Sequence, residues 1–109
     1  MENELIKMKY NKLVRDKIPK IINNDGKKAV THKADKKEYY KKLKEKLKEE
    51  VDEFFISDEE EELADILEVI YEICDFKKIS KKEIEKIRLN KKKNKGGFKG
   101  RIILDRIDK

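Results

Sequence analysis

One predicted helix in the middle of the chain limits the possible folds more than any other feature, because it is apolar on nearly every side. Ser57 and Glu60 have the spacing of an N-terminal capping box, which predicts a helix from about residue 57 to residue 76. Apolar residues dominate it from Leu63 to Cys74, and a helix that is apolar all round must be buried. A chain of 109 residues can hardly surround such a helix by itself. We therefore expect a second copy to help cover it, in a homodimer or homotetramer.

Two other capping pairs predict the neighbouring helices. Asp35 and Glu38 open a long helix to about residue 55, and Ser80 and Glu83 open a helix that ends before a pair of glycines. A shorter helix is expected from about residue 16 to residue 24, with Pro19 in its first turn.

The expected fold class is mainly α, a single helical-bundle domain over residues 1–109 that is completed by oligomerisation. Residues 29–33 alternate weakly, and the tail 101–107 has strand character. These two segments are predicted to form a small hairpin-like pair of strands beside the helices.

The charges are numerous and unevenly placed. Half of the residues are charged and the net charge is +6, but residues 49–68 are strongly acidic whereas residues 77–101 are strongly basic. A surface that binds nucleic acid rarely needs an acidic middle, so we do not expect nucleic acid as the partner. A site that holds a metal ion and a phosphorylated ligand needs both signs of charge.

The compartment is predicted from what the sequence lacks. Cys74 is the only cysteine, so no disulfide can form within the chain. Residues 1–9 look like an ordinary leader without the apolar core of a signal peptide, and no apolar stretch is long enough for a membrane span. A cytoplasmic protein with no membrane partner is expected.

Four carboxylates are predicted to face inward from two neighbouring helices. The apolar stripe that starts at Tyr40 reaches Glu50 by alternating steps of three and four residues, and Glu53 follows one turn later. Glu62 and Asp65 have the same three-residue step on the next helix. Helices joined by a short turn pack antiparallel, so the two pairs are expected to meet near that turn.

Inward-facing carboxylates repel one another and need a cation to neutralise them. Carboxylate oxygens suit Mg²⁺, with Mn²⁺ or Ca²⁺ as alternatives, and the missing Cys/His set argues against zinc. Other acids have simpler roles: Glu59 to Glu61 follow a helix start, and Glu49 can pair with Lys46 on a solvated face. By spacing alone the four inward acids are equally compatible with a metal site and with an ordinary acidic helix surface.

The acidic pattern EExxE (Glu49, Glu50, Glu53) followed by ExxD (Glu62, Asp65) resembles the all-alpha, MazG-like nucleoside triphosphate pyrophosphohydrolases. The segments YNKLVRDKIPKII, EELADILEVIYEI and GGFKGRIIL look like one branch of that superfamily, which also resembles the phosphoribosyl-ATP pyrophosphohydrolases. The resemblance implies an oligomeric, magnesium-dependent hydrolase that converts a nucleoside triphosphate to the monophosphate and pyrophosphate, often to remove aberrant nucleotides. It also implies metal-binding roles for Glu50, Glu53, Glu62 and Asp65. The short gap between the two acidic motifs departs from many relatives and leaves the substrate open.

This chemistry assigns further roles to named residues. Glu53 is predicted to orient the attacking water as the catalytic residue. Glu68 is predicted either to support the site from behind the metal ligands or to pair with a lysine. Basic residues should hold the phosphates, and Arg15 is the best of them because a guanidinium offers two donors. The predicted phosphate-binding residues are Lys12, Arg15, Lys17, Arg88, Lys91 and Lys95.

Two non-enzymatic interpretations are alternatives. A nucleic-acid-binding protein would use the basic C-terminal helix and would bind with a steep dependence on salt. A regulatory or structural helical partner would be indifferent to magnesium and would tolerate Glu62→Gln.

Overall fold

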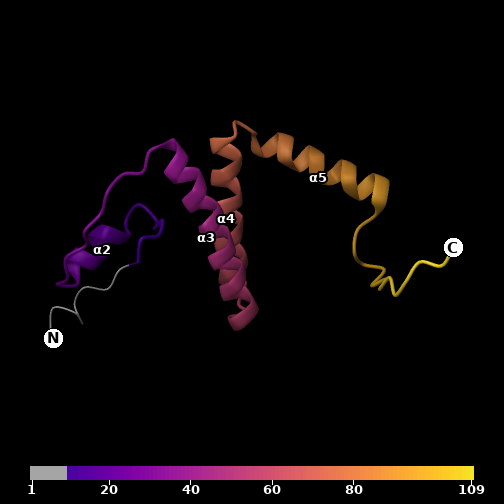
Figure 1. Ribbon diagram of the computed structural model, residues 1–109, viewed down its shortest axis with the longest axis horizontal. Helices are drawn as coiled ribbons and strands as arrows, with labels where there is room; N and C mark the ends of the chain where they lie inside the picture. Colours follow the sequence, from indigo (N-terminus) through magenta and orange to yellow (C-terminus); the bar gives the residue numbers. More distant parts are fainter. Residues whose placement is uncertain (1–9) are drawn as a thin grey trace.

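A helical hairpin forms the centre of the molecule. The computed structural model describes residues 10–109, and the prediction for residues 1–9 lies outside this range. α3 and α4 run antiparallel and pack along their length, whereas α5 leaves from the far end of α4 (Figure 1). The predicted mainly α fold is confirmed. The helices of residues 10–109 are α2 (Ile18–Asn24), α3 (Lys36–Ser57), α4 (Glu60–Phe76) and α5 (Lys81–Lys95).

The start of α3 follows the predicted cap, but the start of α4 does not. Asp35 precedes α3 and its side chain accepts a hydrogen bond from the backbone N–H of Glu38 at 2.8 Å. Ser57 was expected to cap α4, but it is the last residue of α3, and Asp58 follows with a left-handed φ of 57°. The N-cap of α4 is Glu59, without a side-chain cap. The predicted capping box at Ser57 is therefore wrong, because α3 continues through that serine.

The hairpin has a thin core. Leu43 of α3 is 1% exposed, and Val69 and Cys74 of α4 are the other buried apolar residues in the described chain. At the open end, the ring of Phe76 stacks on Tyr40 with centroids 4.9 Å apart and planes 7° apart. Such pairs stabilise a contact by about 0.5–1.5 kcal/mol beyond the area they bury.

Backbone geometry fixes the direction in which α5 leaves α4. Lys78 has a left-handed φ of 60°, and the N–H of Ile79 donates to the carbonyl of Cys74 at 2.8 Å. This is the hydrogen bond of a Schellman motif at a helix C-terminus. Ser80 and Glu83 then form the predicted capping box at the start of α5. The turn is thus defined by local hydrogen bonds on both sides.

The predicted pair of strands is absent. Residues 29–33 and 101–107 are both irregular, and the structure has no strand between residues 10 and 109. In Figure 1 the first segment lies on the N-terminal side of the hairpin and the tail lies beyond α5 on the other side. A strand needs a neighbour for its backbone hydrogen bonds, and neither segment has one.

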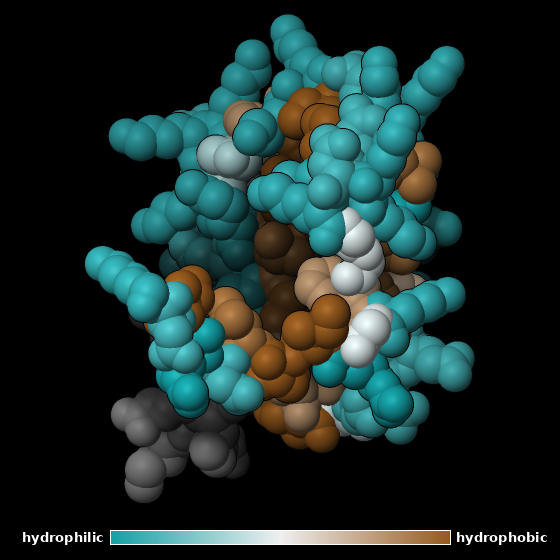
Figure 2. All heavy atoms as spheres, turned by 90° about the vertical axis from the view of Figure 1, so that its right-hand side faces the viewer, coloured by the Kyte–Doolittle hydropathy of each residue, from teal (hydrophilic) through white to brown (hydrophobic). Residues whose placement is uncertain are grey.

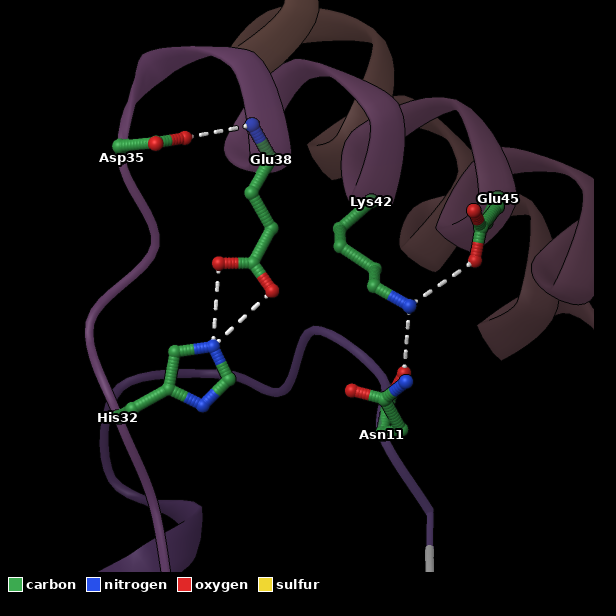
Figure 3. A network of polar contacts seen from close by, with 6 residues as sticks. All are labelled: Asn11, His32, Asp35, Glu38, Lys42 and Glu45. Carbon is green, nitrogen blue, oxygen red and sulfur yellow. Dashed lines mark hydrogen bonds and ion pairs between the residues drawn. The ribbon is translucent and has the colours of Figure 1, made fainter.

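The N-terminal segment, residues 10–35, is held against the first half of α3 by polar contacts (Figure 3). Lys42 donates to the backbone carbonyl of Asn11 at 2.7 Å and pairs with Glu45 at 3.3 Å. His32 lies 3.0 Å from a carboxylate oxygen of Glu38. These contacts are exposed, so they place the segment more than they stabilise the fold.

The chain is elongated and leaves much apolar surface uncovered. Its radius of gyration is 19.2 Å, against about 13 Å for a compact domain of this length. On α4, Leu63 and Leu67 are each 48% exposed. The helices of residues 10–109 are all too polar or too short to cross a bilayer. The predicted burial of α4 on most sides is therefore not achieved by one copy.

Candidate metal centre

Three of the four predicted carboxylates converge between α3 and α4. Glu50 comes from α3, and Glu62 and Asp65 come from the first turns of α4. Each offers a carboxylate oxygen, and these oxygens lie within 4.8 Å of one another. We call these three residues the acid group. The helical stripe that begins at Tyr40 thus carries Glu50 inward as expected, and the antiparallel hairpin brings the second helix to it.

The most unusual member of the acid group is Glu50, which is only 6% exposed. Lys46, one turn earlier on α3, lies 3.3 Å from its Oε1 atom. Its Oε2 atom is buried without a hydrogen-bond partner among the described residues, and so is Oε2 of Glu62. An unpaired buried oxygen of this kind costs about 1–3 kcal/mol, and more when it carries charge. The acid group therefore has lone pairs available for a ligand.

The electrostatics of the acid group favour added positive charge. Burial raises the pKa of Glu50, opposed by Lys46 and reinforced by the charges of Glu53 and Asp65. Burial also raises the pKa of Glu62, together with the charges of Glu53, Asp65 and Glu50. Both raised pKa values mean that these carboxyl groups hold protons more readily than usual, because burial and the neighbouring negative charges disfavour the charged form.

Glu53 and Glu68 lie less deeply than predicted. Glu53 is exposed and lies outside the acid group, although it is close enough to Glu62 to raise the pKa of that carboxyl. Glu68 is exposed and makes no hydrogen bond or ion pair with the other described residues. Glu53 therefore sits at the rim of the acid group, where water has access, and Glu68 points to solvent.

Two cations of the N-terminal segment lie beside these acids. Arg15 donates to Oδ1 of Asp65 at 2.7 Å, and Lys12 donates to Oε1 of Glu49 at 2.7 Å. Burial pushes the pKa of Glu49 upward, but Lys12 and Lys46 outweigh it, so this pKa is lowered. Glu49 is thus a paired surface acid, as predicted.

The predicted basic residues divide into two groups. Lys17 is exposed at the start of α2. Arg88 pairs with Glu85 on α5, and Lys91 and Lys95 are exposed further along the same helix. Asp65 is eleven residues from the end of α4, or about 16 Å along the helix axis, and α5 leads away from that end (Figure 1). One copy therefore brings Arg15 to the acid group but not Arg88, Lys91 or Lys95.

Lys46 makes one contact more than the sequence predicts. The predicted pair with Glu49 is present, at 3.3 Å. Lys46 also pairs with buried Glu50, and its own side chain is only 16% exposed. The four-residue spacing between Lys46 and Glu50 was the signal that could have indicated this contact.

A hollow of about 580 Å³ lies elsewhere, along the first half of α3 between Asn11 and the lysines of residues 37–44. None of the acid group lines it. Comparison with known protein families, with characterised proteins and with solved structures finds no match.

Proposed function

We propose that this protein is a magnesium-dependent nucleoside triphosphate pyrophosphohydrolase. In the proposed reaction, water attacks the α phosphorus of the nucleotide, and the nucleoside monophosphate and pyrophosphate are released. The observation that carries the proposal is the acid group, in which buried Glu50 approaches two carboxylates from the next helix. The similarity of the three sequence segments to MazG-like enzymes supports the same reaction.

The donor set of the acid group fits a hard divalent cation. All three side chains are carboxylates, and oxygen ligands are those that Mg²⁺ and Mn²⁺ prefer. The unpartnered Oε2 atoms of Glu50 and Glu62 are lone pairs that a cation would satisfy. Bound Mg²⁺ would supply positive charge shared between these carboxylates and the phosphates of the substrate.

The remaining roles belong to residues around the acid group. Arg15 is within reach because it already touches Asp65, and its planar guanidinium can bind a phosphate through two donors. Lys12 approaches from the same segment, beside Glu49. Glu53 is exposed at the rim beside Glu62, where water has access, so it is the carboxylate proposed to accept a proton from the attacking water.

The proposed enzyme works in the cytoplasm as a homodimer or homotetramer. Its lone cysteine is buried and free, as suits a reducing compartment. The uncovered apolar residues of α4 favour association of copies.

A screen for pyrophosphate release tests the proposal. Canonical and modified nucleoside triphosphates are incubated with the protein and Mg²⁺, and at least one should give the monophosphate and pyrophosphate. Glu62→Gln should abolish this release, because it removes a charged metal ligand but keeps the shape of the side chain. Glu68→Gln, an exposed acid on the same helix, is the matched control and should keep it. A panel without pyrophosphate release, or equal activity in both variants, contradicts the proposal.

The basic C-terminal region favours one other candidate, a nucleic-acid-binding protein. Residues 81–109 contain twelve lysines and arginines but only four acids. Such binding would weaken by orders of magnitude as salt rises. It would also be insensitive to Glu62→Gln, so the same variant separates the two functions.

A further inference from the structure

The C-terminal arm, residues 81–109, has the composition of a segment that binds another surface. It comprises α5 and the irregular segment that follows it, and it extends away from the hairpin (Figure 1). Most of its apolar side chains are exposed, up to 96% for Phe98. The exposed large apolar residues of the arm are Ile87, Leu89, Phe98, Ile102, Ile103, Leu104 and Ile107.

The hairpin offers a surface of matching chemistry. Its acidic end, residues 49–65, contains ten acids and no lysine or arginine. The same end exposes apolar side chains, namely those of Phe55, Ile56 and Leu63. Figure 2 is seen from the side of the arm and shows apolar side chains gathered in the middle of the molecule, with hydrophilic residues around them. The basic, apolar arm is therefore complementary to the acidic, apolar hairpin end in both charge and hydrophobicity.

The arm cannot reach the hairpin end of its own chain without breaking the turn that precedes it. The Schellman hydrogen bond from Ile79 to Cys74 and the capping box of Ser80 fix the angle between α4 and α5. The ammonium of Lys81 also lies 4.5 Å from the ring centroid of Tyr71, which ties the first residue of α5 to α4. These contacts hold the arm away from its own acidic end, so the complementary surface must come from another molecule.

The area left exposed is large enough for a stable interface. The chain has 10957 Å² of accessible surface, against about 6,400 Å² for a compact chain of this mass. A stable interface buries about 1,200–2,000 Å² from both partners together. The chain thus exposes about 4,600 Å² more surface than a compact chain would. This is more than the area that each copy would bury in a stable interface.

We propose that two copies of this chain exchange their C-terminal arms, each arm lying on the acidic hairpin end of the other copy. The exchange is reciprocal, as in a two-fold dimer. It brings the basic part of α5, with Arg88, Lys91 and Lys95, toward the acid group of the partner copy. Cations that one chain keeps far from its own acid group are thereby supplied by the second copy. This association does not depend on the proposed catalytic activity.

A second copy fits the arm better than a nucleic acid does. Five large apolar residues occupy positions 98–107, and only Phe98 among them is aromatic. Single-stranded nucleic acid is bound through repeated aromatic stacking beside positive charge, whereas aliphatic side chains need an apolar partner surface.

The first experiment measures the mass of the purified full-length chain in solution by sedimentation over a range of micromolar concentrations, without metal or nucleotide. The wild-type chain should be a dimer or a pair of dimers. The double variant Ile102→Asp/Ile103→Asp should raise the dissociation constant by about 30-fold or more, because it places charges in the apolar contact. Val30→Asp is the matched control, since Val30 is 87% exposed in the N-terminal segment, and it should leave the dimer intact.

The second experiment needs no substitution. Isotopically light and heavy chains are mixed, and lysines are joined to carboxylates by a zero-length cross-linker. Links between the arm and residues 49–65 should join light to heavy chains. A monomer, arm links found only within one chain, or a dimer that survives the double aspartate variant would overturn the proposal. A chain that stays monomeric and binds RNA through the arm would overturn it as well. Because catalysis is not assayed, failure here is distinct from failure of the pyrophosphohydrolase proposal.

Discussion

Replacing Glu50 by glutamine should make the metal-free protein more stable. The substitution keeps the shape of a side chain that is only 6% exposed but removes its charge. It gives up the 3.3 Å ion pair with Lys46, but it ends the burial of an unpartnered carboxylate oxygen. The new amide is also a donor next to Glu62, whose Oε2 atom has no partner among the described residues. An unsatisfied buried acceptor costs about 1–3 kcal/mol, so after loss of the Lys46 contact we expect a net gain of about 1 kcal/mol.

Magnesium should reverse the order of stability. A ligand that binds only the folded state stabilises it by about 2.7 kcal/mol at one hundred times its dissociation constant. The wild-type chain should gain this stability, whereas Glu50→Gln loses a charged ligand and should gain little. The assay is thermal unfolding followed by the helical circular dichroism signal, with and without Mg²⁺. For a chain of this length, 1 kcal/mol corresponds to a shift of about 4–8 °C in Tm.

The matched control is Glu68→Gln, which neutralises an exposed acid of α4 that has no polar contact with other described residues. It should unfold at the wild-type temperature in both conditions. Two results would refute the reasoning: a metal-free Glu50→Gln protein clearly less stable than wild type, or the same magnesium stabilisation in both proteins. The first would mean that the Lys46 pair outweighs the cost of burial, and the second that no cation binds at Glu50.

Three further predictions concern Arg15, the cap of α5 and the pKa of Glu50. Arg15→Ala should lower the free energy of unfolding by less than about 1 kcal/mol, because the side chains of its pair with Asp65 are 57% and 37% exposed. It should nevertheless raise KM for the nucleotide by about 10–100-fold, because a charged contact to the phosphates is lost. Equal KM values for variant and wild type in steady-state assays would contradict this. Ser80→Ala should lower the free energy of unfolding by about 1 kcal/mol in denaturant titrations, because a side-chain cap of α5 is lost, and an unchanged midpoint would argue against the cap. Without metal, the raised pKa of Glu50 means that the folded chain binds protons more tightly than the unfolded chain. The stability of wild type relative to Glu50→Gln should therefore fall as pH rises from the ordinary carboxyl range through this raised pKa. If this relative stability instead rises over the same pH range, the assignment is refuted.

Local signals in the sequence predicted the helices well. The capping pairs at Asp35 and at Ser80 act within one turn, so their spacing was sufficient to locate the starts of α3 and α5. The same pattern failed at Ser57, because whether α3 stops before that serine depends on the geometry of the whole hairpin turn. The inward position of Glu50 followed from the apolar stripe, since helical periodicity alone decides which face a residue occupies.

Features that depend on distant parts of the chain could not be predicted. Strand character at residues 29–33 and 101–107 says nothing about whether a pairing partner lies nearby, and here none does. The direction of α5 depends on the left-handed φ of Lys78. Lysine seldom adopts this conformation, and no motif in the sequence predicts it. The ion pair between Arg15 and Asp65 joins residues fifty positions apart, so only the folded chain could reveal it.

The contact between Arg15 and Asp65 also sets up a competition. An incoming cation would draw on the same carboxylate oxygens that anchor the N-terminal segment, so each occupant must weaken the hold of the other by an equal factor. Loosening of residues 10–17 would then act as a reporter of occupancy. Faster cleavage of this stretch by trypsin, which cuts after lysine and arginine, would register a filled centre even where no reaction is measured.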